Sequence, residues 1–246
     1  MVSVCLASYH GERYIKEQID SILSQLGKDD ELIISDDGSS DKTISIIQAY
    51  DDCRIRLLHN THHGVNFNFE NAIRHAQGDY IFWSDQDDVW FPHKVQTCLG
   101  LLQDNDLVVH DCVVVDKSLN TIYPSYFKQF KSRSGYIKNI IKNSYLGACI
   151  AFRKEILDYV LPIPSAWPVY IDGWIASLAE LNGRICFCDT PLMYYRRHDS
   201  NTSPSAGRSH FSTYERICQR CGWLYLTLQR TFKYRYTQPR NRLWKN

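Results

Sequence analysis

The chain has 246 residues, and its 28 basic residues almost balance its 27 acidic ones. A hydrophobic share of 44% excludes a disordered chain, and no stretch reaches the roughly 18 apolar residues of a membrane span. The balance hides a division, because residues 207–246 hold nine basic residues and one acid, whereas residues 1–206 carry a net charge of −7. Such a division bears on the partners of the protein rather than on its fold.

The first hundred residues alternate between short apolar runs and amphipathic segments. Ile15, Ile19 and Ile22, for example, fall on one face of a helix. Strands are predicted at 2–7, 31–35, 54–59 and 79–83, and helices at 15–26, 43–50, 66–76 and 92–102. This alternation predicts a parallel sheet flanked by helices.

The second half is less regular, and its elements are predicted from shorter patterns. Strands are expected at 107–115 with a break around Asp111, at 144–152 around a close-approach glycine, Gly147, and at 185–188 and 192–196. Helices are expected at 153–159, 172–181 and 211–232. The last of these would carry a mixed basic and aromatic face. No repeat or linker is visible, so we predict one domain and a tail.

Two groups of acids directly follow predicted strands. Asp36 and Asp37 come after the second strand, and Asp85, Asp87 and Asp88 come after the fourth. In open α/β sheets, ligands bind beyond the carboxyl ends of the strands. Carboxylates spaced one residue apart can share a divalent cation, and hard oxygen ligands select Mg²⁺ or Mn²⁺. Taken singly, each group could also be a solvated loop or a turn that serves the backbone.

Three strings occur in order and at fitting distances: VSVCLASYHGE, IISDDGSSD and GDYIFWSDQDDVWFPHK. Together they resemble the family-2 glycosyltransferases, which have the nucleotide-binding GT-A fold. The resemblance continues through Gly147, Asp172 and the string DTPLMYYRRHDSN, and so reaches about residue 202. The SDQDDVW and YRRH strings look most like bacterial rhamnosyltransferase-type members that act in surface polysaccharide synthesis.

The resemblance implies a nucleotide-sugar site at the first two strand ends. Asp37 matches the acid that accepts a hydrogen bond from the uracil or thymine imide, with Asp36 beside it. Ala7, Ser8 and Tyr9 match the first loop of the family, which contacts the base and the ribose. Glu12 matches an acid that supports this loop.

The resemblance also implies a metal and a general base. Asp85 and Asp87 match the DxD motif, with Asp87 on the metal and Asp85 on the ribose or a metal-bound water. Asp88 would support them or face the donor sugar. Asp172 lies where the family carries the base that activates the acceptor. Near the end of the match, a metal or pyrophosphate contact falls on His198, and Gly147 belongs to the donor site. Apart from the resemblance, Arg196 and Arg197 could pair with the pyrophosphate, or one of them could be a plain charge at the end of a strand.

Two positions depart from the family pattern. His10 stands where the family usually has asparagine, which could modify the contacts to the base. Asp172-Gly173-Trp174 replaces the more common Asp-Trp-Trp or Glu-Asp, and this makes the base less secure than the metal motif. Aromatic residues near the base are candidates for an acceptor wall: Trp167, Tyr170 and Trp174.

The predicted protein is a metal-dependent, inverting glycosyltransferase with an α/β, Rossmann-like, mostly parallel sheet of the GT-A type. Residues 1–206 would form the catalytic domain, with a nucleotide-binding half at about 1–105 and an acceptor half at about 106–206. It would move a sugar such as rhamnose, galactose or glucose from a UDP- or dTDP-sugar to a saccharide acceptor, expected to be lipid-linked, with Mn²⁺ or Mg²⁺. The alternatives are a non-catalytic nucleotide-sugar or polyanion-binding module and a nucleotide-sugar hydrolase.

The tail at 207–246 interleaves basic and aromatic residues, and is expected to be helical. Such a segment can lie on an anionic membrane, with aromatic rings at the interface and cations on headgroups. A solvated helix packed on the body is the plainer alternative, and nucleic acid is not expected as a partner because the body is acidic. We therefore expect a cytoplasmic protein, at the cytoplasmic face of the inner membrane if the tail binds lipid.

The amino terminus lacks the features of a secretory signal, so the nine cysteines are expected to be reduced thiols that are mostly buried as small apolar residues. Cys218 and Cys221 form a lone CxxC pair. A structural zinc site there would need His198 or His210 to complete it, and ordinary thiols are the simpler interpretation.

Overall fold

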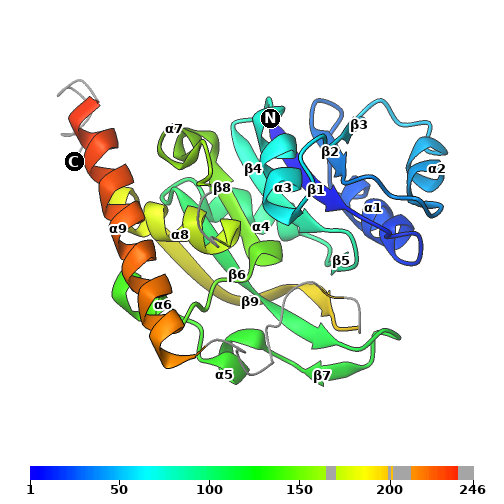
Figure 1. The fold of residues 1–246 in the computed structure, drawn as a ribbon. Coiled ribbons are helices and arrows are strands. Elements are labelled where there is room, and N and C mark those ends of the chain that lie inside the picture. Colours follow the sequence, from blue (N-terminus) through cyan, green and yellow to red (C-terminus); the bar gives the residue numbers. More distant parts are fainter. Residues whose placement is uncertain (165–169, 199–200, 202–211, 238–246) are drawn as a thin grey trace.

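The computed structural model describes residues 1–164, 170–198, 201 and 212–237, apart from the side chains at 213, 214 and 216. A nine-stranded sheet runs through the molecule in the order β3-β2-β1-β4-β8-β6-β9-β5, with β7 paired to β6, and helices flank it (Figure 1). The strands are β1 Val2–Ser8, β2 Glu31–Asp36, β3 Ile55–His59, β4 Tyr80–Asp85, β5 Val89–Trp90, β6 Leu107–Val115, β7 Thr121–Tyr123, β8 Ile150–Arg153 and β9 Ile185–Arg196. The helices are α1 Ile15–Leu23, α2 Thr43–Gln48, α3 Val65–Arg74, α4 Lys94–Leu101, α5 Tyr126–Phe130, α6 Tyr136–Ile141, α7 Leu157–Val160, α8 Ile171–Asn182 and α9 Thr213–Thr237, with short 3₁₀ turns at Gly147–Cys149 and Lys154–Ile156.

The first half of the chain forms the parallel part of the sheet. Strands β3, β2, β1 and β4 are parallel neighbours, and β1 lies between β2 and β4. The side chains of β1, β2 and β4 are almost continuously buried, as expected for strands covered on both faces, whereas those of the edge strand β3 are only partly buried. Ser8 is paired with Asp36, and Ala7 with Asp85. This register brings the two acidic loops to one edge of the sheet, as the sequence predicts.

The second half completes the same sheet with mixed pairing. Strand β8 is antiparallel to β4 and β6, and β9 is parallel to β6 but antiparallel to β5. The α/β class is confirmed, and the sheet is mixed: β1 to β4 pair with one another only in parallel, whereas the second half combines the parallel pair of β6 and β9 with antiparallel pairs.

Two predicted boundaries in this half are wrong. The strand predicted at 144–152 begins only at Ile150, because the chain first makes the 3₁₀ turn that contains Gly147. The strands predicted at 185–188 and 192–196 are one continuous strand, β9. Strand β6 is also continuous, and in place of the break expected around Asp111 its pairing with β9 shifts register there, where Asp111 pairs with Pro191. A register shift absorbs the irregularity without ending the ladder.

Helix α9 packs against α6, α7 and α8 (Figure 1). Arginine side chains of α9 donate to the carbonyl oxygens at the ends of these helices. Arg220 binds the carbonyl of Ile141 at 2.6 Å, and Arg235 binds that of Leu181. Arg230 donates to the carbonyls of residues 160, 161 and 162 at 3.1, 3.0 and 2.8 Å. Cations are favourable at helix carboxyl ends, where backbone carbonyls lack intrahelical partners. Part of the basic charge of the tail therefore holds the fold together.

Helix α9 is long, but its polar residues distinguish it from a membrane span. Among the described residues, no helix combines the length and hydrophobicity needed to cross a bilayer.

We expect Arg230→Met to lower the free energy of unfolding by about 2–3 kcal/mol, because several charge-assisted hydrogen bonds to half-buried carbonyls are lost together. Urea denaturation followed by circular dichroism would measure this change. The matched control is Lys233→Met, one turn further along α9, whose side chain is exposed and should change stability by no more than about 0.5 kcal/mol. Equal stability of the two variants would contradict the capping role.

Candidate active site

The first loop, which follows β1, is fastened to the acidic loop after β4. The backbone N–H of Tyr9 donates to Gln86 Oε1 at 2.8 Å, and Gln86 Nε2 donates back to the carbonyl of Tyr9 at 2.9 Å. Gly11 makes this possible, because a Cβ there would lie 2.3 Å from Gln86 Oε1. The ring of Tyr9 is exposed and stacks on His10, with ring centroids 4.0 Å apart. An exposed aromatic ring at a strand end can stack on a nucleobase.

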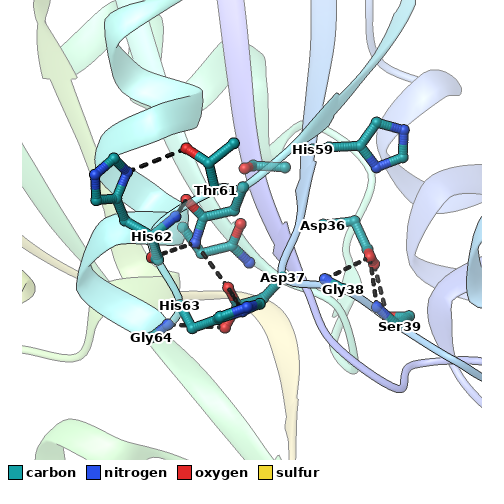
Figure 2. A network of polar contacts seen from close by, with 12 residues as sticks. Asp36, Asp37, Gly38, Ser39, His59, Thr61, His62, His63 and Gly64 are labelled. Atoms are coloured by element: carbon teal, nitrogen blue, oxygen red, sulfur yellow. Dashed lines mark hydrogen bonds and ion pairs between the residues drawn. The ribbon is translucent and has the colours of Figure 1, made fainter.

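Asp36 shapes the second loop from a buried position. Its carboxylate accepts hydrogen bonds from the hydroxyl of Ser8 at 2.8 Å and from the backbone N–H groups of Gly38 and Ser39 at 3.0 and 2.7 Å, as Figure 2 shows for the last two. The hydroxyl of Ser39 adds a fourth bond at 2.7 Å. With four donors from its own chain, Asp36 orders the loop and also ties it to β1.

Asp37 points the other way, toward the turn before α3 (Figure 2). Its carboxylate accepts from Asn60 Nδ2 at 2.7 Å and from the N–H of Gly64 at 2.9 Å, and His63 Nδ1 lies 3.4 Å away. The positive φ of Gly64, 120°, lets the chain turn there. Asp37 is thus fixed between β2 and α3, and its oxygens are available as acceptors only along the remaining directions. His62 and His63 are exposed in this turn.

Glu12 links the first loop to the start of α2. Its carboxylate accepts from the N–H of Lys42 at 2.9 Å, and its own N–H donates to Asp41 Oδ2 at 3.1 Å. This reciprocal pair supports the first loop, which is the role that the resemblance implies for Glu12.

Asp87 contacts two residues of the string DTPLMYYRRHDSN, which lies far from it in the sequence. His198 Nε2 lies 2.8 Å from Asp87 Oδ2, and Asn201 Nδ2 donates to the same oxygen at 3.1 Å. These residues are 111 and 114 positions apart in the sequence. The sequence predicted that both Asp87 and His198 would contact the metal, and the structure brings this pair together.

Arg196 holds the acidic loop in place. Its buried side chain donates from Nε to the carbonyl of Asp87 at 2.8 Å, and its backbone N–H donates to Asp88 Oδ1 at 3.0 Å. The guanidinium also pairs with Glu17 and lies 4.6 Å from the ring centroid of Tyr14. The side chain is therefore engaged by the protein, and the predicted pyrophosphate contact stays a prediction.

The acidic loop concentrates negative charge in a poorly solvated place. Burial, helped by the charges of Asp87 and Asp172, raises the pKa of Asp85 to about 8. Burial and the charges of Asp87 and Asp85 also raise the pKa of Asp88 well above its usual range. The second carboxylate oxygen of Asp88 is buried without a hydrogen-bond partner.

This oxygen-rich set fits a hard divalent cation, which would supply the counter-charge that the crowded carboxylates need. In the parts of the chain that are described, however, no three His, Cys, Asp or Glu side chains are grouped closely enough to hold a metal as they stand. Asp85, Asp87 and His198 therefore do not form a preformed cluster of metal ligands, and the metal contact of Asp85 stays a prediction. No zinc cluster involves Cys218 and Cys221 within these same residues, and His210 lies outside them.

Asp172 lies in the first turn of α8, against the 3₁₀ turn that contains Gly147. A Cβ at Gly147 would lie 3.2 Å from the Cβ of Asp172 and 3.4 Å from Trp83 Nε1. The carboxylate accepts from the N–H of Gly173 at 2.7 Å. Burial raises the pKa of Asp172 to about 6, while hydrogen bonds from the backbone of Gly173 and Gly147 oppose this rise. Such a group is ionised at neutral pH and basic enough to accept a proton.

We expect Gly147→Ala to lower kcat by about tenfold to 100-fold, because the added methyl group must displace Asp172 or Trp83 and small misplacements in a site are costly. Steady-state kinetics would measure this, with circular dichroism to show that the variant folds. Gly100→Ala is the matched control, since nothing lies within 4 Å of the added Cβ there. Equal activity of the two variants would show that Gly147 does not position the site.

The candidate acceptor wall is only partly supported. Trp174 is 1% exposed and donates from its indole N–H to the carbonyl of Val160, so its prediction as a wall residue is wrong. It faces the interior because it lies on the buried side of α8. Tyr170 is 60% exposed, and Trp167 lies outside the described residues.

Sequence reasoning missed the side chains that support the site. Gln86 binds the first loop, Asn60 binds Asp37, and Asn201 binds Asp87. Gln86 lies inside the DQDD string and Asn201 three residues after His198. Their positions within motifs were the available signal.

Comparisons with known proteins agree with this geometry. The sequence model of "Glycosyl transferase family 2" matches residues 3–161. An uncharacterised glycosyltransferase of Nostoc is 31% identical over 83% of this chain and 67% of its own length. The dTDP-rhamnosyl transferase RfbG of Shigella flexneri is 28% identical over 86% of this chain and 78% of its own. A beta-1,3-glucosyltransferase of Escherichia coli, WfgD, named for UDP-Glc and a GlcNAc-diphosphoundecaprenol acceptor, is 26% identical over 82% and 79%.

Solved structures match the fold. TarS of S. aureus, in complex with UDP-GlcNAc, superposes with a TM-score of 0.70 at 20% identity, covering 95% of this chain and 71% of its own. A mannosyltransferase of Pyrobaculum calidifontis, in complex with GDP-Man and Mn²⁺, gives a TM-score of 0.59 at 17% identity, covering 94% and 64%. The sheet, the acidic strand ends and the family match together define a glycosyltransferase of the GT-A fold. The chain belongs to glycosyl transferase family 2.

Proposed function

We propose that the protein is a metal-dependent, inverting hexosyltransferase that moves a sugar from a UDP- or dTDP-sugar to a saccharide acceptor on a lipid carrier in bacterial surface polysaccharide synthesis. One observation carries this proposal: the ends of β1, β2 and β4 bring the first loop, Asp37 and the Asp85–Asp88 loop to one edge of the sheet. The rhamnosyl and glucosyl relatives support rhamnose or glucose as donor sugars, and galactose remains among the predicted ones.

The nucleotide would lie across the first two strand ends. Tyr9 offers an exposed ring for the base, Asp37 an acceptor for the imide N–H, and Ala7 and Ser8 a backbone edge for the ribose. Asp36 and Glu12 would act indirectly, because their carboxylates order these loops.

Mn²⁺ or Mg²⁺ would be held by Asp87 and His198, with Asp85 close by, and would stabilise the negative charge of the leaving diphosphate. Arg196 would position Asp87 and Asp88 through its hydrogen bonds to both residues. The crowded acids of this loop would repel a diphosphate alone, but would accept a diphosphate that is bound to the divalent cation.

Asp172 would remove the proton from the attacking acceptor hydroxyl. Its ionised form predominates above pH 6, given its pKa of about 6. An acceptor that approaches from Asp172, opposite the leaving diphosphate, would invert the anomeric configuration in a single displacement. Charge development at the sugar would resemble an oxocarbenium ion, as in other glycosyl transfers.

We further propose that residues 1–206 form the catalytic domain and that residues 207–246 bring it to the cytoplasmic face of the inner membrane. In the described part of the tail, large apolar side chains stay exposed on α9 at successive turns: Tyr225, Leu228, Phe232 and Tyr236. A helix with an exposed apolar stripe can lie in a membrane interface.

A panel of UDP- and dTDP-sugars tests the reaction. Nucleotide release would be measured with Mn²⁺, with Mg²⁺ and with chelator, each with and without a bacterial lipid extract. We expect release from one nucleotide class that needs both metal and extract. The absence of release from every donor would refute the transferase, whereas release that is independent of any acceptor would favour a hydrolase.

A further inference from the structure

A second basic surface lies outside the tail. Residues 117–154 contain eight lysines and arginines and no acid. The cations on α5, on α6, on the turn between them and directly after α6 are exposed: Lys128, Lys131, Arg133, Lys138 and Lys142. Within the described residues, none of the ion pairs involves these side chains. Their charge is therefore not neutralised by an ion pair with any other described residue.

Two large aliphatic side chains interrupt these cations. Ile137 is 60% exposed and Ile141 57% exposed, and they lie one turn apart on α6. Lys138 and Lys142 directly follow them in the sequence. We call these seven residues, from Lys128 to Lys142, the α5–α6 surface. Apolar side chains that emerge among unpaired cations match the composition of a segment that enters a membrane interface.

We propose that the α5–α6 surface docks the protein on an anionic lipid bilayer. The cations of this surface would be neutralised by a polyanion, and the two isoleucines would be buried in an apolar layer behind that polyanion. A bilayer with anionic headgroups provides both. A single-stranded nucleic acid would instead be bound by exposed aromatic rings for stacking, and the exposed apolar residues of this surface are aliphatic. A second copy of the chain would bring like charges together.

The α5–α6 surface is connected through α9 and Asn143 to the helix that carries the candidate base. Arg220 of α9 binds the carbonyl of Ile141 at 2.6 Å, and the hydroxyls of Tyr136 and Thr227 are hydrogen-bonded. Asn143 follows α6, and its Nδ2 would lie 3.4 Å from a Cβ at Gly173, the neighbour of Asp172. Docking on lipid would thus place the acceptor side of the site near the bilayer. This consequence, unlike the docking itself, rests on the proposed lipid-linked acceptor.

Vesicle flotation of the full chain tests the proposal. We expect the protein to float with vesicles of phosphatidylglycerol and phosphatidylcholine, and not with phosphatidylcholine alone. Lys138→Gln with Lys142→Gln should weaken partitioning about 25-fold, since each interfacial cation contributes roughly fivefold. Ile137→Ser with Ile141→Ser should weaken it by about tenfold, because buried apolar area is lost.

The matched control is Lys28→Gln with Lys42→Gln, two exposed lysines of the nucleotide-binding half. Partitioning of this control should equal that of the unmodified protein. The proposal is overturned if the α6 variants float as well as the control, or if they lose binding to an RNA oligonucleotide while vesicle binding is unchanged. Flotation uses neither donor nor acceptor, so its result is independent of whether the proposed transfer reaction is found.

Discussion

Asp87→Asn is expected to lower kcat by about 10³-fold, the range seen when a charge-stabilising group is removed from a preorganised site. Asp87 is the acid on which His198, Asn201 and Arg196 converge. Asparagine keeps the shape of the side chain but removes its negative charge, so the loop should retain its fold and lose its affinity for a divalent cation. Steady-state kinetics over a range of Mn²⁺ concentrations would separate a loss of metal affinity from a loss of turnover.

Asp104→Asn is a suitable control for this variant, because Asp104 is exposed after α4 and precedes β6, which begins beside the start of β4 and so at the edge of the sheet opposite the Asp85–Asp88 loop. It should retain both kcat and the metal dependence of the unmodified protein. If Asp87→Asn behaved in the same way, the acidic loop would not be the metal site and the proposed mechanism would be wrong.

Asp172→Asn is expected to lower kcat by about 10²–10⁴-fold, the usual contribution of a general base. The KM for the donor should change little, because the proposed contacts to the base, the ribose and the metal lie at the ends of β1, β2 and β4, whereas Asp172 lies in α8. For the unmodified protein, kcat should fall as the pH drops through about 6, since burial raises the pKa of Asp172 to that value and the protonated acid cannot accept a proton. The asparagine variant should lack this acidic limb.

Stability should respond to Asp172→Asn in the opposite direction. The pKa of Asp172 is higher in the folded protein than in an unfolded chain, so ionisation of this group costs folding free energy as the pH rises toward and through 6. Removal of the charge should leave the protein at least as stable at neutral pH. A variant that was inactive because it was unfolded would be recognised at once by circular dichroism and would not count as support for the base.

The parallel half of the sheet and its acidic edge were predictable from the sequence. Little tertiary information is needed to predict these strands, because short apolar runs are typical of strands buried on both faces, as β1, β2 and β4 are. The second half was less predictable. The continuity of β9 depends on its pairing with β6, which absorbs an irregularity at Asp111. A single sequence holds no signal for a strand that continues through a proline.

The predicted site residues were easier to find than the manner in which they act. Asp36 and Arg196 were expected to contact the nucleotide sugar, but in the structure their side chains are occupied by partners from the protein. Loops that carry such chemistry also need internal hydrogen bonds, and a motif does not distinguish its contacting residues from its supporting ones. Trp174 illustrates the same limit, because a helix near a base presents one face to the ligand and another to the core.

The charge division of the chain has a different meaning after the fold is known. Arg220, Arg230 and Arg235 of the basic tail bind the ends of α6, α7 and α8. Among the described residues, a group of exposed cations outside every ion pair lies on the α5–α6 surface, in a stretch where the sequence showed only a local absence of acids. Net charge alone could not separate cations that hold the fold from cations that meet a partner.

The most direct test of the central claim follows a labelled sugar from the donor to the lipid phase. The full chain would be incubated with a UDP- or dTDP-sugar labelled in the sugar, Mn²⁺ and a bacterial lipid extract, and then partitioned between butanol and water. We predict that label enters the butanol phase only when metal and extract are both present, and that Asp172→Asn abolishes this transfer. Release of nucleotide while all of the label stays in water as free sugar would contradict the account, because the protein would then be a hydrolase.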